Sequence, residues 1–80
     1  MHFDITHKHL LYGMPRSETS CPALLAIQDQ LPGCRALCDG VNFFIDGRAY
    51  QVPEDLAAWQ SRFDGPERHK AGPTRFELSI

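Results

Sequence analysis

Two Asp-Gly dipeptides constrain the fold of this chain more than any other feature of its sequence. Asp39-Gly40 and Asp46-Gly47 each separate two apolar runs. An Asp-Gly pair is typical of a two-residue type I′ hairpin turn, because both central residues of that turn need a positive φ. The pattern therefore predicts a three-stranded antiparallel meander between residues 34 and 52.

Two-residue turns would also fix the register of this meander. Cys38 would pair with Val41 around the first turn, and Ile45 with Arg48 around the second. Side chains alternate between the two faces of a sheet. One face would be nearly all apolar and would form the core side, with Cys34, Ala36, Cys38, Val41, Phe43, Ile45, Tyr50 and Val52. The other face would be mixed, with Arg35, Leu37, Asn42, Phe44, Ala49 and Gln51.

Both ends of the chain predict strands, since apolar and polar residues alternate over 2–5 and 74–80. Three further segments, 7–12, 22–31 and 53–64, carry helix signals: a cap or a proline at the start and a glycine near the end. The expected order is β-α-α-β-β-β-α-β. We predict a single small α+β domain over 1–80, with a mainly antiparallel sheet (the three-stranded meander plus the terminal strands) packed with two main helices.

Composition restricts the classes of function. The chain has 80 residues, of which 42% are hydrophobic and 22% charged, as is typical of a folded domain. Its net charge of −2 argues against a strongly basic nucleic-acid binder. We expect no membrane span, because no apolar run approaches roughly 18 residues. We also expect no secretory signal, because the N-terminus has no basic stretch followed by an apolar one. Three cysteines without such a signal indicate reduced thiols in a cytoplasm.

Two groups of residues offer chemistry. His7, His9 and Cys21 are of the types that bind zinc. No cysteine pair on a tight knuckle accompanies them, because Cys34 and Cys38 fall about 13 Å apart on one predicted strand; a small metal-binding protein is thus an alternative only. Cys21 would begin a helix, where a thiol pKa can be lowered, with His9 as its base. Since no acid–base carboxylate pair, phosphate loop or oxyanion loop stands out, we expect a non-enzymatic protein without a cofactor.

The surface offers three ways to bind a partner. Phe44 would lie on the mixed face, where either a helix covers it or it is an exposed anchor. The protein interface expected there comprises Arg35, Leu37, Phe44 and Gln51. Alternatively, the basic stretch over 62–75 would bind nucleic acid weakly through Arg62, Arg68, Lys70 and Arg75. The final strand could also be a sheet edge that pairs with a second copy, which would give a homo-oligomer.

Five short segments are spread across most of the chain: Ile5–Gly13, Cys21–Ile27, Val52–Glu54, Phe63–Gly65 and Pro73–Leu78. They are similar to an Ile-Thr-x-x-His segment that ends in glycine, a Cys-Pro helix, a Leu-Pro-x-Glu helix, a Phe-Asp-x-Gly stop and a Pro-x-x-Phe-x-Leu strand. Together these segments resemble a family of small proteins encoded by tailed phages and prophages. The chain lacks a cysteine that many members carry before the Cys-Pro pair, and its 65–73 loop is longer and more basic.

The resemblance implies an accessory protein in the cytoplasm of a bacterial host and implies no particular activity. Together with the residues, it predicts a non-enzymatic phage protein that acts by binding a host or phage protein. Weak nucleic-acid binding and metal binding are the two alternatives.

Overall fold

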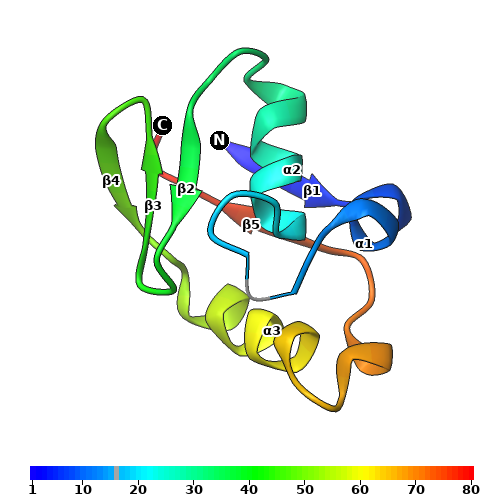
Figure 1. Ribbon diagram of the computed structural model, residues 1–80. Helices are drawn as coiled ribbons and strands as arrows, with labels where there is room; N and C mark the ends of the chain where they lie inside the picture. Colours follow the sequence, from blue (N-terminus) through cyan, green and yellow to red (C-terminus); the bar gives the residue numbers. More distant parts are fainter. Residues whose placement is uncertain (16) are drawn as a thin grey trace.

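Strands and helices follow one another in the predicted order (Figure 1). The computed structural model describes residues 1–15 and 17–80, so Arg16 in the expected 14–20 loop lies outside the described residues. The α+β class and the order β-α-α-β-β-β-α-β are confirmed, and a short 3₁₀ helix is added before the last strand. The elements are β1 His2–Ile5, α1 His7–Tyr12, α2 Pro22–Gln30, β2 Ala36–Cys38, β3 Asn42–Ile45, β4 Arg48–Gln51, α3 Glu54–Asp64, η1 Arg68–Lys70 and β5 Thr74–Glu77.

The strands form two sheets rather than one. The antiparallel meander β2-β3-β4 is present as predicted, whereas β1 and β5 pair only with each other among the described strands. Their ladder continues beyond the strands, since the Leu78 amide donates to the Met1 carbonyl oxygen at 3.0 Å. The two ends of the chain are therefore fastened together in a separate two-stranded ribbon.

An aromatic stack joins the two sheets. The Phe76 ring of β5 lies 5.2 Å from the ring of Phe3 in β1 and 5.7 Å from that of Phe43 in β3. All three side chains are buried. Offset aromatic pairs of this kind add about 0.5–1.5 kcal/mol beyond the area they bury. The stack thus connects residues near both termini to the middle of the meander.

Both main helices bury one apolar stripe against the rest of the protein. In α2, Leu24 and Ile27 are fully buried, and in α3 Leu56, Trp59 and Phe63 face the core. Pro22 occupies the first turn of α2, where its missing amide hydrogen costs nothing. Two acidic residues open α3, where the helix dipole favours negative charge.

Gly13 allows α1 and α2 to pack closely. A Cβ at this position would lie 2.6 Å from the His9 carbonyl oxygen and 2.6 Å from the Pro22 ring. The main chain of Gly13 also donates to that His9 carbonyl at 2.8 Å, which ends α1. Any larger residue would have to push the two helix ends apart.

The two turns of the meander differ. Asp46 and Gly47 both have a positive φ, and Ile45 pairs with Arg48, as the type I′ prediction requires. The predicted register of the first turn is wrong by two residues, because Cys38 pairs with Phe43 and not with Val41. Asp39 lacks the positive φ that a type I′ turn requires, and its Oδ1 accepts the amides of Val41 and Asn42 at 2.8 and 2.7 Å.

This side-chain cap moves the turn to Gly40 and Val41. A shift of two residues keeps every other side chain on its predicted face, since the period of a strand is two. Val41 is the exception: it was expected on the core face, but it lies in the turn and is 63% exposed.

Adjacent phenylalanines on opposite faces of β3 provide a matched test of this fold. Phe43 is fully buried, whereas Phe44 is exposed on the other face. We expect Phe43→Ala to lower the free energy of unfolding by about 3–5 kcal/mol, because it leaves a cavity in the core. Phe44→Ala should cost about 1 kcal/mol or less. Urea denaturation measures both values, and equal losses would contradict the assignment of faces.

The Asp39 cap predicts a pH dependence. The Asn42 and Val41 amides hold the pKa of the Asp39 carboxyl below its ordinary value of 3.8. A lowered folded-state pKa stabilises the fold above the unfolded pKa, and this stabilisation is lost as the pH falls through the folded value. Asp39→Asn keeps an acceptor oxygen but loses the charge. Its urea midpoint should lie below that of the wild type at pH 7 and approach it at about pH 2.

Asp39→Ala is the control for this experiment, because it also removes the acceptor. Its midpoint should stay below that of the wild type at both pH values. A difference between wild type and Asp39→Asn that does not change with pH would contradict the cap.

Candidate functional site

A row of apolar side chains crosses the solvent face of the meander. Leu37, Phe44 and Ala49 are direct neighbours on β2, β3 and β4. All three are exposed, Leu37 to 49% and Phe44 to 36%. No described element covers them. The sequence left open whether a helix shields Phe44, and the burial pattern decides that it is accessible.

Polar groups flank this row along the strands. At one end Arg35 is exposed, and its main-chain amide donates to Asp46 Oδ1 at 2.9 Å. Its guanidinium forms no ion pair with any described residue. At the other end Gln51 pairs with Asn42. We call Arg35, Leu37, Phe44, Ala49 and Gln51 the outer face; it contains the whole protein interface predicted from the sequence.

His9 is a structural residue. Its ring is buried, and Nδ1 accepts the main-chain amide of Thr6 at 2.9 Å. Nδ1 therefore lacks a proton, and Nε2 donates to Asp29 Oδ2 at 2.6 Å. This hydrogen bond lowers the pKa of the Asp29 carboxyl. His9 thus ties the start of α1 to the last turn of α2, with both ring nitrogens occupied.

The structure does not bring the three residues of the metal alternative together. No three histidine, cysteine or acidic side chains among them are grouped so as to hold a metal ion. His7 is exposed on α1, Cys21 is buried at the start of α2, and the nitrogens of His9 bond to other partners. Residue types that commonly bind zinc are therefore present in the sequence, but the described part of the chain does not group them into one site.

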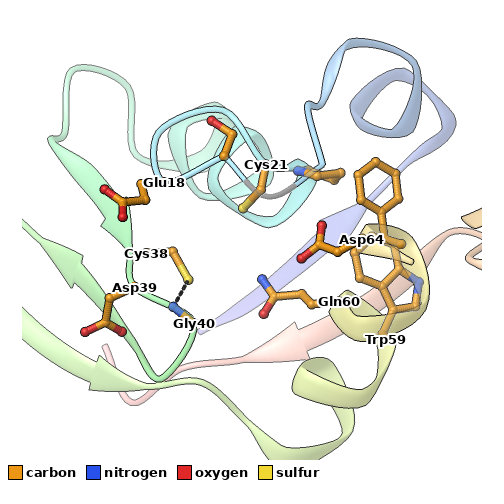
Figure 2. A pocket seen from close by; sticks show the side chains of 11 residues that line it. Glu18, Cys21, Cys38, Asp39, Gly40, Trp59, Gln60 and Asp64 are labelled. Atoms are coloured by element: carbon orange, nitrogen blue, oxygen red, sulfur yellow. Dashed lines mark hydrogen bonds between the residues drawn. The ribbon is translucent and has the colours of Figure 1, made fainter. Parts of the chain in front are cut away.

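Two cysteines point into one pocket (Figure 2). Cys21 enters it from the start of α2 and Cys38 from the end of β2, and the pocket has a volume of about 240 Å³. Trp59, Gln60 and Asp64 of α3 line the opposite wall. The Gly40 amide donates to the Cys38 sulfur at 3.4 Å. Sequence reasoning did not anticipate this pocket, because its walls come from segments that are distant along the chain.

The thiols of this pocket are poor nucleophiles. Burial raises the pKa of Cys21 to about 11 and also raises that of Cys38. A helix start can lower a thiol pKa, but at Cys21 the loss of water outweighs the nearby amides of Leu24 and Ala23. Nor can His9 act as the base for Cys21, since neither of its ring nitrogens is available.

The four residues of the nucleic-acid alternative are largely engaged within the protein. Lys70 pairs with Glu67 at 3.0 Å, and Arg75 pairs with Asp4 at 2.6 Å across the β1–β5 ribbon. The Arg68 guanidinium lies 4.6 Å from the centre of the Phe63 ring. Arg62 is exposed on α3. Lys70 and Arg75 are therefore ion-paired, whereas Arg62 and Arg68 form no ion pair with a described residue.

A second exposed apolar cluster lies at the end of α1 and was missed. Leu11, Tyr12 and Met14 are all largely exposed. Six residues make fewer than two turns of helix, so the spacing of apolar residues in α1 does not show which side of the helix faces the core. In α1 the polar residue His9 is buried, whereas Leu11 and Tyr12 are exposed. A core position that is ordinarily apolar is therefore occupied by a histidine.

Comparisons with protein-family models, curated proteins and solved structures found no match. Among the described residues, no helix is both long and apolar enough to span a membrane.

Thiol labelling tests the assignment of the cysteines. Cys34 is only half-buried, whereas Cys21 and Cys38 are buried. In the native protein at pH 7.5, we expect an alkylating reagent to modify Cys34 first, and the other two at least about tenfold more slowly than in urea. Mass spectrometry of the peptides measures this order, and Cys34→Ser is the control. Rapid labelling of native Cys21 would instead indicate an activated thiolate.

Proposed function

We propose that this protein is a non-enzymatic binding module that docks a host or phage protein on its outer face. The observation that carries this proposal is the accessible row of Leu37, Phe44 and Ala49 on a rigid three-stranded sheet. A partly sheltered aromatic side chain at the centre of such a face is typical of the residues that dominate binding energy.

The polar rim suggests the chemistry of the partner. Arg35 supplies a guanidinium without an ion-pair partner in the described part of the chain, and Gln51 and Asn42 supply amides. A complementary surface would offer an apolar recess for Phe44 and carboxylates for Arg35. The partner is therefore an acidic-rimmed protein surface rather than a nucleic acid.

Two further considerations support a binding role over a catalytic one. Burial raises the pKa of both thiols in the pocket, Cys21 and Cys38, and so disfavours the thiolate that a nucleophile needs. The resemblance to small phage proteins implies a bacterial cytoplasm as the setting in which this protein would meet its target. The outer face is preferred over the α1 cluster because it lies on paired strands, which hold side chains in fixed positions.

A matched pull-down tests the proposal. Tagged wild type, Phe44→Ser and Leu11→Ser are used to capture proteins from nuclease-treated host lysate and from phage-infected lysate. We expect one stoichiometric protein to be captured by the wild type and by Leu11→Ser, and at least about tenfold less by Phe44→Ser. Leu11 is the control because it is exposed and apolar but lies on α1.

Circular dichroism must show that Phe44→Ser remains folded. Arg35→Glu should capture less of the partner than the wild type does, since its carboxylate repels the carboxylates of the partner. Added salt should weaken capture by the wild type and strengthen capture by Arg35→Glu, because salt screens both interactions. Capture that Phe44→Ser leaves undiminished would overturn the proposal. The wild type is also used with lysate that has not been treated with nuclease. If it captures material only from that lysate, the nucleic-acid alternative is favoured.

A further inference from the structure

Strand β4 has an edge that pairs with no other described strand. Strand order is β2-β3-β4, so β2 and β4 are the two edges of this sheet, and β4 lies at its margin in Figure 1. The β2 edge is engaged at Cys38, whose amide donates to the Glu18 carbonyl oxygen at 3.0 Å. β4 makes its extensive contacts with β3 alone among the described elements.

The hydrogen-bond pattern shows which groups of β4 are free. The Val52 amide donates to the Val41 carbonyl oxygen at 2.9 Å, which makes Val41 and Val52 a hydrogen-bonded pair. Such pairs alternate along an antiparallel ladder. Tyr50 and Arg48 therefore bond to β3, and the main-chain N–H and C=O groups of Ala49 and Gln51 point away from the sheet.

From these free groups we infer that β4 pairs antiparallel with β4 of a second copy, which gives a six-stranded sheet across a two-fold axis. Only one register uses all the free groups: Ala49 of each copy opposite Gln51 of the other, with the two Tyr50 residues facing each other. If Ala49 faced Ala49, Gln51 would meet Gly47, which lies in a turn with φ +84°. If Gln51 faced Gln51, Ala49 would meet Pro53, which has no amide hydrogen.

Charge also favours a second copy as the occupant. In this register Arg48 lies opposite Val52, two residues before the acidic start of α3 at Glu54 and Asp55. Arg48 forms no ion pair with a described residue. The two-fold axis brings each Arg48 toward the acidic helix start of the other copy. By contrast, the exposed side chains Arg75 and Glu77 of β5 already pair with Asp4 and His2 within one copy.

The strand is short, so the dimer should be weak. Four main-chain hydrogen bonds and one pair of tyrosines bury far less surface than a stable complex needs. The inference does not rest on the proposed partner, because it concerns the purified protein alone. Pairing would place two outer faces on one continuous sheet, since Ala49 and Gln51 belong to both features.

Sedimentation equilibrium of the purified protein provides the first test. The apparent mass should rise from 9.0 kDa toward twice that value as concentration increases from about 10 µM to about 1 mM. Ala49→Pro should remain monomeric at every concentration. Proline is tolerated on an edge strand where its nitrogen faces outward, so this variant should fold. A wild type that stays monomeric at about 1 mM would overturn the inference.

A cysteine scan tests the register. In a Cys34→Ser background, Ala49→Cys, Tyr50→Cys and Gln51→Cys are each oxidised at about 1 mM. Only Tyr50→Cys should form a disulfide-linked dimer, because residues facing each other in a non-hydrogen-bonded pair have Cα atoms about 4.5 Å apart, within disulfide range. Dominant cross-linking at residue 49 or 51 would show a different register and overturn this one. If Tyr50→Cys does not fold, sedimentation equilibrium still decides whether the β4 edge pairs. The apparent mass should then increase with concentration in the wild type but not in Ala49→Pro.

Discussion

The ring of Phe76 holds the two sheets of this protein together. It stacks on Phe3 of its own sheet and on Phe43 of the meander, and all three rings are buried. The two sheets share no main-chain ladder among the described strands. Their relative position therefore depends on side-chain packing, in which the stack joins residues from the beginning, middle and end of the chain. The loss of surface exposed to water on forming this core is the main favourable term.

Short-range hydrogen bonds then decide details that packing leaves free. The His9 ring accepts the Thr6 amide and donates to Asp29, which places a polar residue in the core without an unsatisfied group. The Asp39 carboxylate accepts two amides and moves the first turn of the meander by one residue along the chain. In both cases a polar side chain takes up main-chain donors that would otherwise lack a partner.

The meander has two features that remain available for other molecules. Its outer face carries an apolar row around Phe44, and its β4 edge carries free main-chain groups at Ala49 and Gln51. The two are different in kind. Side-chain shape and charge give the face its selectivity, whereas the edge would bind through main-chain hydrogen bonds. The pocket between Cys21, Cys38 and Trp59 is a third feature, in which buried thiols act as packing groups.

The elements and their order could be predicted from the sequence, because caps, prolines, glycines and alternating apolar residues are local signals. The sequence also assigned Phe44 and Leu37 to the face opposite the core, since a strand's side-chain period survives a register shift of two residues. Cross-strand neighbours in the second hairpin followed from Asp46-Gly47 for the same local reason. The first hairpin did not follow, because the Asp39 side chain competed with the expected turn.

The contacts between segments that are distant along the chain could not be predicted from local patterns. The strands form two sheets, because β5 pairs with β1 and contacts the meander through the Phe76 ring instead of adding a strand to it. The tertiary structure left the outer face uncovered, brought Cys21 and Cys38 into one pocket, and raised their pKa by removing water. It also separated His7, His9 and Cys21, which only their residue types had linked. Each of these outcomes depends on which surfaces meet in three dimensions, and local patterns along a chain carry no such information.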